Sequence, residues 1–199
     1  MTQSLSQLTN AERLALLTQV GPGTDMGRLL RRFWHPVAVA AKTAPGKARA
    51  IKVLGEELTL YRGESGAFHL VDGRCPHRRT LLHTGWVQGE EVRCIYHGWK
   101  FSGAGQCTEA PAEGAETAAK IRIKAYPVRE YCGLVFAYLG EGAAPEFDLP
   151  RKPDFEKPGL LVIARAQVWP TNFFQMIENS LDAVHVSRSE EHTSELQSL

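Results

Sequence analysis

Two short loops, each with one cysteine and one histidine, constrain this chain more than any other feature. The first loop reads C-P-H over residues 75–77, and the second, after sixteen intervening residues, reads C-I-Y-H over residues 94–97. Thiolates and imidazoles are ligands that zinc and iron prefer in proteins. The sequence therefore predicts a metal centre held by Cys75, His77, Cys94 and His97.

The division of the ligands between the loops distinguishes the kinds of metal site. A structural zinc finger usually supplies two cysteines first and two histidines later, whereas a Rieske [2Fe-2S] centre takes one of each from each loop. Cysteines then hold one iron and histidines the other. Because neutral imidazoles replace two thiolates, the cluster carries less negative charge and accepts an electron more easily. We expect a one-electron carrier; zinc, or four unrelated polar residues, are the alternatives.

The residues around these loops resemble a known family. The run C-P-H-R-R from Cys75 and the run C-x-Y-H-G-W-K-F from Cys94 look like the Rieske domain of ring-hydroxylating oxygenase large subunits, nearest to the phthalate dioxygenase-like branch. Similar flanks lie at residues 21–24, 29–36 and 105–107, so the resemblance covers about residues 20–187. It implies an α+β chain in which a mainly β Rieske domain (36–140) follows an N-terminal helical segment (1–35).

Local patterns predict the elements of that domain. A capping box at residues 9–12 predicts a helix, and a second short helix is expected over residues 26–33. Runs with strand character, most of them separated by turn residues, lie at residues 34–39, 49–54, 57–62, 68–71, 92–95, 99–102 and 131–139. Residues 110–119 are expected to be a surface loop and residues 141–159 a connector. Three further histidines lack a partnering motif and are expected to be structural: His35, His69 and His83.

Composition excludes several classes of function. Net charge is +1, from 23 basic and 22 acidic side chains, so neither nucleic acid nor an anionic membrane is an expected partner. The chain has no apolar run near the length of a membrane span and no secretion signal at its start, which favours a cytoplasmic protein. Cys107 and Cys132, the two remaining cysteines, are expected to be buried thiols.

A second metal site begins after the connector. A strand is expected over residues 160–169 and a helix over residues 172–186, together the start of a second domain (160–187). Asp182 and His185 are three residues apart and therefore share a helix face. Alone they would more often be a surface pair, but the resemblance implies that His185 is the first histidine ligand of a mononuclear Fe(II) and that Asp182 orients it. The second histidine is expected at position 189 or 190, where the chain has serine and glutamate.

The last residues explain this break in the pattern. Residues 188–198, RSEEHTSELQS, read like the translation of a widely used DNA-sequencing adapter. We therefore expect residues 188–199 to be a non-native tail on a C-terminally truncated large subunit, in which the carboxylate ligand of the iron would lie downstream. A natural polar tail is the alternative.

The resemblance also implies a reaction for the intact parent. A flavin- or ferredoxin-type reductase would bring electrons from NAD(P)H to the cluster, which would pass them singly to the mononuclear iron, where O2 is activated. An aromatic and possibly carboxylated substrate would be hydroxylated or oxidatively dealkylated. Subunits of the family usually form trimers, in which Asp182 would link one subunit's cluster to its neighbour's iron. The fragment itself is expected only to bind the cluster and transfer electrons; a Rieske ferredoxin-type carrier is the alternative.

Overall fold

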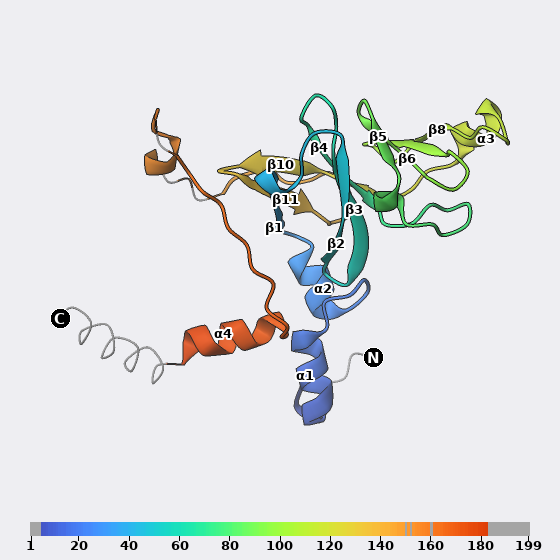
Figure 1. The fold of residues 1–199 in the computed structure, drawn as a ribbon. Helices are drawn as coiled ribbons and strands as arrows, with labels where there is room; N and C mark the ends of the chain where they lie inside the picture. The colour runs from blue at the N-terminus through green and yellow to red at the C-terminus, as the bar shows by residue number, and fades with distance from the viewer. Residues whose placement is uncertain (1–4, 150, 152, 160, 183–199) are drawn as a thin grey trace.

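Antiparallel β-sheets are the largest part of the regular secondary structure in the computed structural model, which describes residues 5–149, 151, 153–159 and 161–182 (Figure 1). Within these residues three sheets have the strand orders β1-β11-β10, β2-β3-β4-β9 and β5-β6-β7-β8. The α-helices are α1 Asn10–Thr18, α2 Asp25–Leu30, α3 Ala115–Lys120 and α4 Phe173–Leu181, and the strands are β1 Trp34–Val39, β2 Lys47–Val53, β3 Glu56–Arg62, β4 Phe68–Asp72, β5 Trp86–Gln88, β6 Glu91–Arg93, β7 Lys100–Ser102, β8 Cys107–Glu109, β9 Ala125–Tyr126, β10 Val128–Tyr131 and β11 Leu134–Tyr138.

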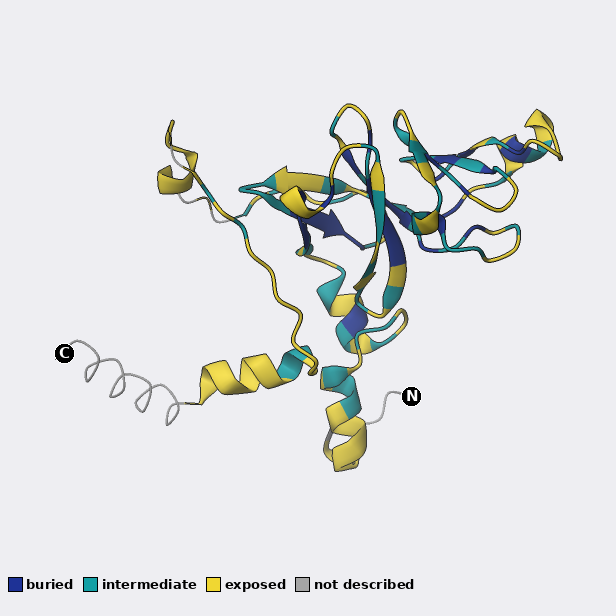
Figure 2. Ribbon diagram, viewed as in Figure 1, coloured by how far each residue is buried: buried dark blue, intermediate teal, exposed yellow. Residues whose placement is uncertain are grey.

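Strand β3 connects the two hydrophobic cores. Because side chains alternate between the faces of a strand, Leu58 and Leu60 point into one core while Tyr61 points into the other. The first core is shared with β1 and β11, and the second contains the buried side chains of the β5–β8 sheet. Buried residues accordingly run through the middle of the molecule along these strands (Figure 2). The predicted α+β class with a mainly β domain is confirmed.

The N-terminal helices are fixed to the sheets by one arginine. The predicted capping box of α1 is formed by Thr9 and Glu12. At the C-terminus of α2, the guanidinium of Arg31 donates to the Glu56 carboxylate at 2.8 Å, and both side chains are nearly buried, with 13% and 11% exposed. The same guanidinium donates to backbone carbonyls of Val20, Gly27 and Leu54. This network attaches α2 to the β2–β3 hairpin.

A carboxylate in the turn between β5 and β6 joins that small sheet to β4. Glu90 accepts a hydrogen bond from the backbone N–H of Ser65 and forms a second one with Nε2 of His69, at 2.9 and 2.8 Å. The hydrogen bond with His69, followed by that from Ser65, lowers the pKa of Glu90 to about 2. Since the ordinary value for glutamate is about 4.3, the carboxylate stabilises the fold fully above that pH, and this stabilisation is lost as the pH falls toward the folded-state pKa.

We therefore expect Glu90→Gln to destabilise the protein near neutral pH and to have a smaller effect in acid. The difference in the free energy of unfolding between wild type and variant should shrink as the pH is lowered from about 5 to about 2. Urea titrations at a series of pH values measure it, with Glu64→Gln in an exposed turn as the control. A difference that stays constant with pH would contradict the assigned role of Glu90.

Two sequence-based expectations about local structure are wrong. Residues 161–169 form no strand: none of the described strands pairs with them through backbone hydrogen bonds, and this segment is mostly exposed (Figure 2). Residues 110–119 are not a loop throughout: α3 begins at Ala115, after Gly114 turns the chain with φ +82°. Its alanine-rich run favours helix, and Ala118 is buried.

Other expectations fit better. The strand predicted over residues 34–39 is β1, and His35 has the predicted structural role, since its Nε2 lies 2.7 Å from the carbonyl oxygen of Leu30. Cys107 is buried as predicted, whereas Cys132 is only half-buried. No helix among the described residues is long and apolar enough to cross a membrane.

Candidate metal centre

The two cysteine–histidine loops share one backbone design, although they come from different sheets. In the first loop, which follows β4, Cys75 N–H donates to the carbonyl of Thr80, and the N–H of Arg79 donates back to the carbonyl of Cys75, both at 2.9 Å. In the second loop, between β6 and β7, Cys94 makes the corresponding bonds with Trp99 and Gly98.

The fourth residue after each cysteine closes its loop by adopting the left-handed region. Arg79 has φ +60° and Gly98 has φ +76°. Glycine takes this conformation without strain, while an arginine does so at a cost that the surrounding loop must offset. Nothing in the sequence pointed to this conformation at Arg79.

The cysteines of the two loops are brought together in the core. Cys75 and Cys94 are almost completely buried, at 1% and 2% exposed, and neither forms a disulfide. Burial, together with the neighbouring Cys94, raises the pKa of Cys75 to about 11, although the backbone N–H groups of His77 and Arg78 act in the opposite direction. Metal coordination deprotonates a thiol outright, so a bound cation would offset the cost of two adjacent buried thiolates.

The histidine side chains of the two loops also lie close together. The ring centroids of His77 and His97 are 4.5 Å apart, and the indole of Trp99 stacks on His77 at 4.7 Å with an interplanar angle of 10°. Nδ1 of His77 is buried and has no hydrogen-bond partner in the part of the chain that the structure describes. A buried imidazole nitrogen without a partner is costly, so this atom fits a metal ligand.

The pairing of cysteine with cysteine and of histidine with histidine favours a two-iron cluster over a single metal ion. A zinc ion needs three or four donors around one point, and the described residues contain no group of three or more histidines, cysteines and acidic residues that could hold one ion. Instead, sulfur lies beside sulfur and imidazole beside imidazole. A Rieske [2Fe-2S] cluster, with cysteines on one iron and histidines on the other, requires this division.

Comparison with known protein families settles the kind of domain. Residues 33–130 match the family described as the Rieske [2Fe-2S] domain. The chain carries a Rieske domain. The resemblance predicted from the C-P-H-R-R and C-x-Y-H-G-W-K-F runs is confirmed, and the Rieske domain is the part that contains both loops.

Several curated relatives are named as oxygenase subunits. The chain is 42% identical over 187 residues to the 5,5'-dehydrodivanillate O-demethylase oxygenase subunit of a Sphingobium species, covering 89% of this chain and 43% of the relative. It is 35% identical over 185 residues to the phthalate 4,5-dioxygenase oxygenase subunit of Pseudomonas putida, covering 90% of this chain and 42% of the relative. The chain thus spans less than half the length of these relatives.

Solved structures with a similar fold also include oxygenases. An oxygenase–ferredoxin complex of carbazole 1,9a-dioxygenase is 27% identical with a TM-score of 0.66, covering 78% of this chain and 41% of the oxygenase. Dicamba monooxygenase with non-heme iron is 26% identical with a TM-score of 0.57, covering 66% of this chain and 40% of its own. The relationship of the Rieske domain to oxygenases therefore holds in sequence and in fold.

The second predicted site lies only partly within the described residues. Asp182 is the exposed C-cap residue of α4, and α4 begins with Asn172 as its N-cap. His185 lies outside the described residues, as does the whole predicted tail over residues 188–199. Their roles stay predictions.

One side chain at the centre was missed by sequence analysis. Glu113 lies in the segment expected to be a solvent-facing loop, yet its carboxylate accepts a hydrogen bond from Trp99 and approaches His77. The preceding Pro111 also packs against Gly98 of the second loop. Nothing in the spacing of the sequence reveals that contact.

Proposed function

We propose that Cys75, His77, Cys94 and His97 hold a [2Fe-2S] cluster and that the chain is the electron-accepting part of an oxygenase large subunit. The observation that carries this proposal is the pairing of the two thiols and of the two imidazoles within a matched Rieske domain. When bound, the cluster takes up and releases one electron at a time. The buried cysteines and the stacked Trp99 keep water from it, and the exposed edge of the second loop faces solvent.

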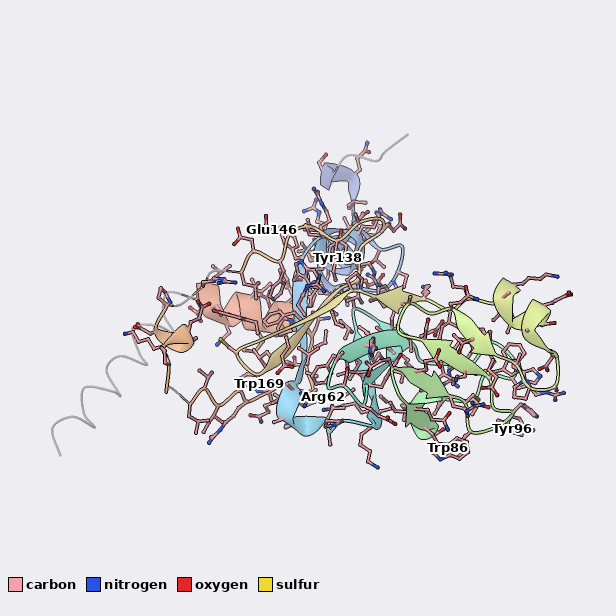
Figure 3. The ribbon with its side chains drawn as sticks, turned by 90° about the horizontal axis from the view of Figure 1, so that it is seen from above. Arg62, Trp86, Tyr96, Tyr138, Glu146 and Trp169 are labelled. Atoms are coloured by element: carbon pink, nitrogen blue, oxygen red, sulfur yellow. The ribbon has the colours of Figure 1, made fainter. Side chains whose placement is uncertain are left out.

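That exposed edge offers a place for an electron donor. Ile95 and Tyr96 of the second loop are 47% and 58% exposed, and Trp86 at the start of β5 is 52% exposed. Tyr96 and Trp86 lie at the same end of the molecule, away from Trp169 (Figure 3). Apolar side chains of this kind are enriched at protein interfaces. We propose a reductase or ferredoxin partner that receives its electrons from NAD(P)H and docks here.

For the intact parent, we propose an oxygenase reaction on an aromatic substrate. Two of its relatives are named for O-demethylation of 5,5'-dehydrodivanillate and for dioxygenation of phthalate, both of which are aromatic compounds. His185 would be one ligand of a mononuclear Fe(II). The intact parent would be a homotrimer in the cytoplasm. The alternative is a free-standing Rieske ferredoxin-type carrier; the segment with α4 and Asp182 favours the oxygenase, because a carrier does not need it.

Iron and sulfide analysis tests the proposal. The chain, reconstituted anaerobically with ferrous iron and sulfide, should contain two irons and two acid-labile sulfides per chain and give a rhombic electron paramagnetic resonance signal after dithionite reduction. Zinc without labile sulfide, or no rhombic signal, would overturn it. A third iron per chain would mean that the mononuclear site also forms.

Asp182→Ala should suppress turnover in the intact parent and leave the cluster unchanged. A carboxylate that orients a ligating histidine typically contributes about 10- to 100-fold to activity or metal affinity. The measurements are oxygen consumption with substrate and the spectrum of the reduced cluster, with Glu178→Ala, earlier on the same helix, as the control. Normal oxygen-dependent turnover in Asp182→Ala would refute this role.

A further inference from the structure

A single carboxylate contacts both the histidine of the first loop and the tryptophan of the second. Trp99 Nε1 donates a hydrogen bond to Oε2 of Glu113 at 2.9 Å. The other oxygen, Oε1, lies 3.8 Å from Nε2 of His77, too far for a hydrogen bond but within ion-pair range. Because Trp99 also stacks on His77, the three side chains form one group beside the proposed cluster.

The backbone holds Glu113 at this place. Its N–H donates to the carbonyl of Ala110, and its own carbonyl accepts from the Thr117 hydroxyl at 3.0 Å. Ala110 is buried in the same core as the cluster cysteines. In addition, Pro111 packs so closely on Gly98 that a Cβ on that glycine would lie 3.3 Å from the proline ring. The carboxylate is therefore aimed at His77 by a loop anchored to the core and to the second cluster loop.

We propose that Glu113 is a positioning residue for His77 and lowers the reduction potential of the cluster. This inference rests on the proposed function. Nδ1 of His77, the buried nitrogen without a partner, would face the metal, which leaves Nε2 toward the carboxylate. A carboxylate near the outer nitrogen makes a ligating imidazole more electron-donating and fixes the orientation of its ring.

The charge of Glu113 acts in the same direction. Reduction adds one electron and converts one ferric ion to ferrous, so it adds negative charge next to a carboxylate that is already negative. The side chains of His77 and Glu113 are only 24% and 30% exposed, so solvent screens this repulsion incompletely. Neutralising Glu113 should therefore favour the reduced cluster.

The test is the reduction potential of three reconstituted chains. Glu113→Gln keeps an acceptor for the Trp99 N–H but removes the charge, and should shift the reduction equilibrium toward the reduced state by about tenfold, or about 59 mV for a one-electron couple. Glu116→Gln makes the same charge change on an exposed residue of α3. It should change the reduction potential by only a small fraction of the shift expected for Glu113→Gln. Redox titration with mediators, followed by the visible spectrum, provides the measurement.

A charge-reversal variant of Glu113 provides a second, independent measurement. Glu113→Lys should move the potential in the same direction and further, with iron and sulfide contents equal to those of the wild type. An unchanged potential in both Glu113 variants, or an equal shift in Glu116→Gln, would overturn the inference while leaving the cluster assignment intact. Failure of the wild-type chain to take up iron and sulfide would instead overturn the proposed function.

Discussion

Cys94→Ser should remove the [2Fe-2S] cluster from the chain. Its sulfur lies beside that of Cys75 in a site with almost no exposure, so no other thiol can take its place. A serine hydroxyl is a far weaker ligand for iron than a thiolate. Iron and sulfide contents should fall from about two of each per chain to near zero, and the rhombic signal of the reduced protein should disappear.

Cys107→Ser is the matched control for this change. Cys107 is also buried, at 2% exposed, in the same core, and its thiol donates to the carbonyl of Glu109, a bond that a serine hydroxyl can also make. This variant should retain the cluster. Retention of a full cluster by Cys94→Ser, or its equal loss from both variants, would contradict the ligand assignment.

Arg31→Met should cost about 3 kcal/mol of unfolding free energy, at the lower end of the range for breaking a buried ion pair. Methionine preserves much of the apolar stem but removes every hydrogen bond that the guanidinium makes, three of them to backbone carbonyls. It also leaves the buried Glu56 with Lys124 and Tyr126 as its remaining side-chain partners among the described residues. Urea unfolding followed by circular dichroism measures the change.

An exposed arginine on the same helix provides the comparison. Arg28 pairs with Asp25, but both side chains are more than half exposed, at 64% and 59%. Such surface pairs contribute about 0 to 1 kcal/mol, so Arg28→Met should shift the unfolding midpoint little. Similar losses in the two variants would show that the Arg31 network does not hold α2 to the hairpin.

The sequence was most informative where chemistry requires particular residue types. The C-P-H and C-x-Y-H-G-W spacings predicted loops that the structure brings together, because only a few side chains can bind iron. Strands with alternating apolar residues, such as β3 and β4, were also recognisable. Short strands such as β5 and β8 were missed, since three residues are too few to establish a period.

Other errors have a tertiary origin. Residues 161–169 have a strand-like composition, but a strand forms only where a neighbour takes up its hydrogen bonds. The position of Glu113 depends on how Pro111 meets Gly98, a contact between distant parts of the chain. Composition alone could not distinguish this glutamate from the solvated ones around it.

Strand β3 contributes side chains to both hydrophobic cores, and this limits how the domain can be divided. Leu58 and Leu60 face one core, while Tyr61 faces the core that contains Cys75 and Cys94. Excising only residues 75–109, which contain both cluster loops and the β5–β8 sheet, to make a minimal redox protein would leave one side of that core open to water. An electron-transfer domain that is to be moved into another protein would have to begin at β1 and end with β11. Residues 34–138 should therefore be transferred as one piece.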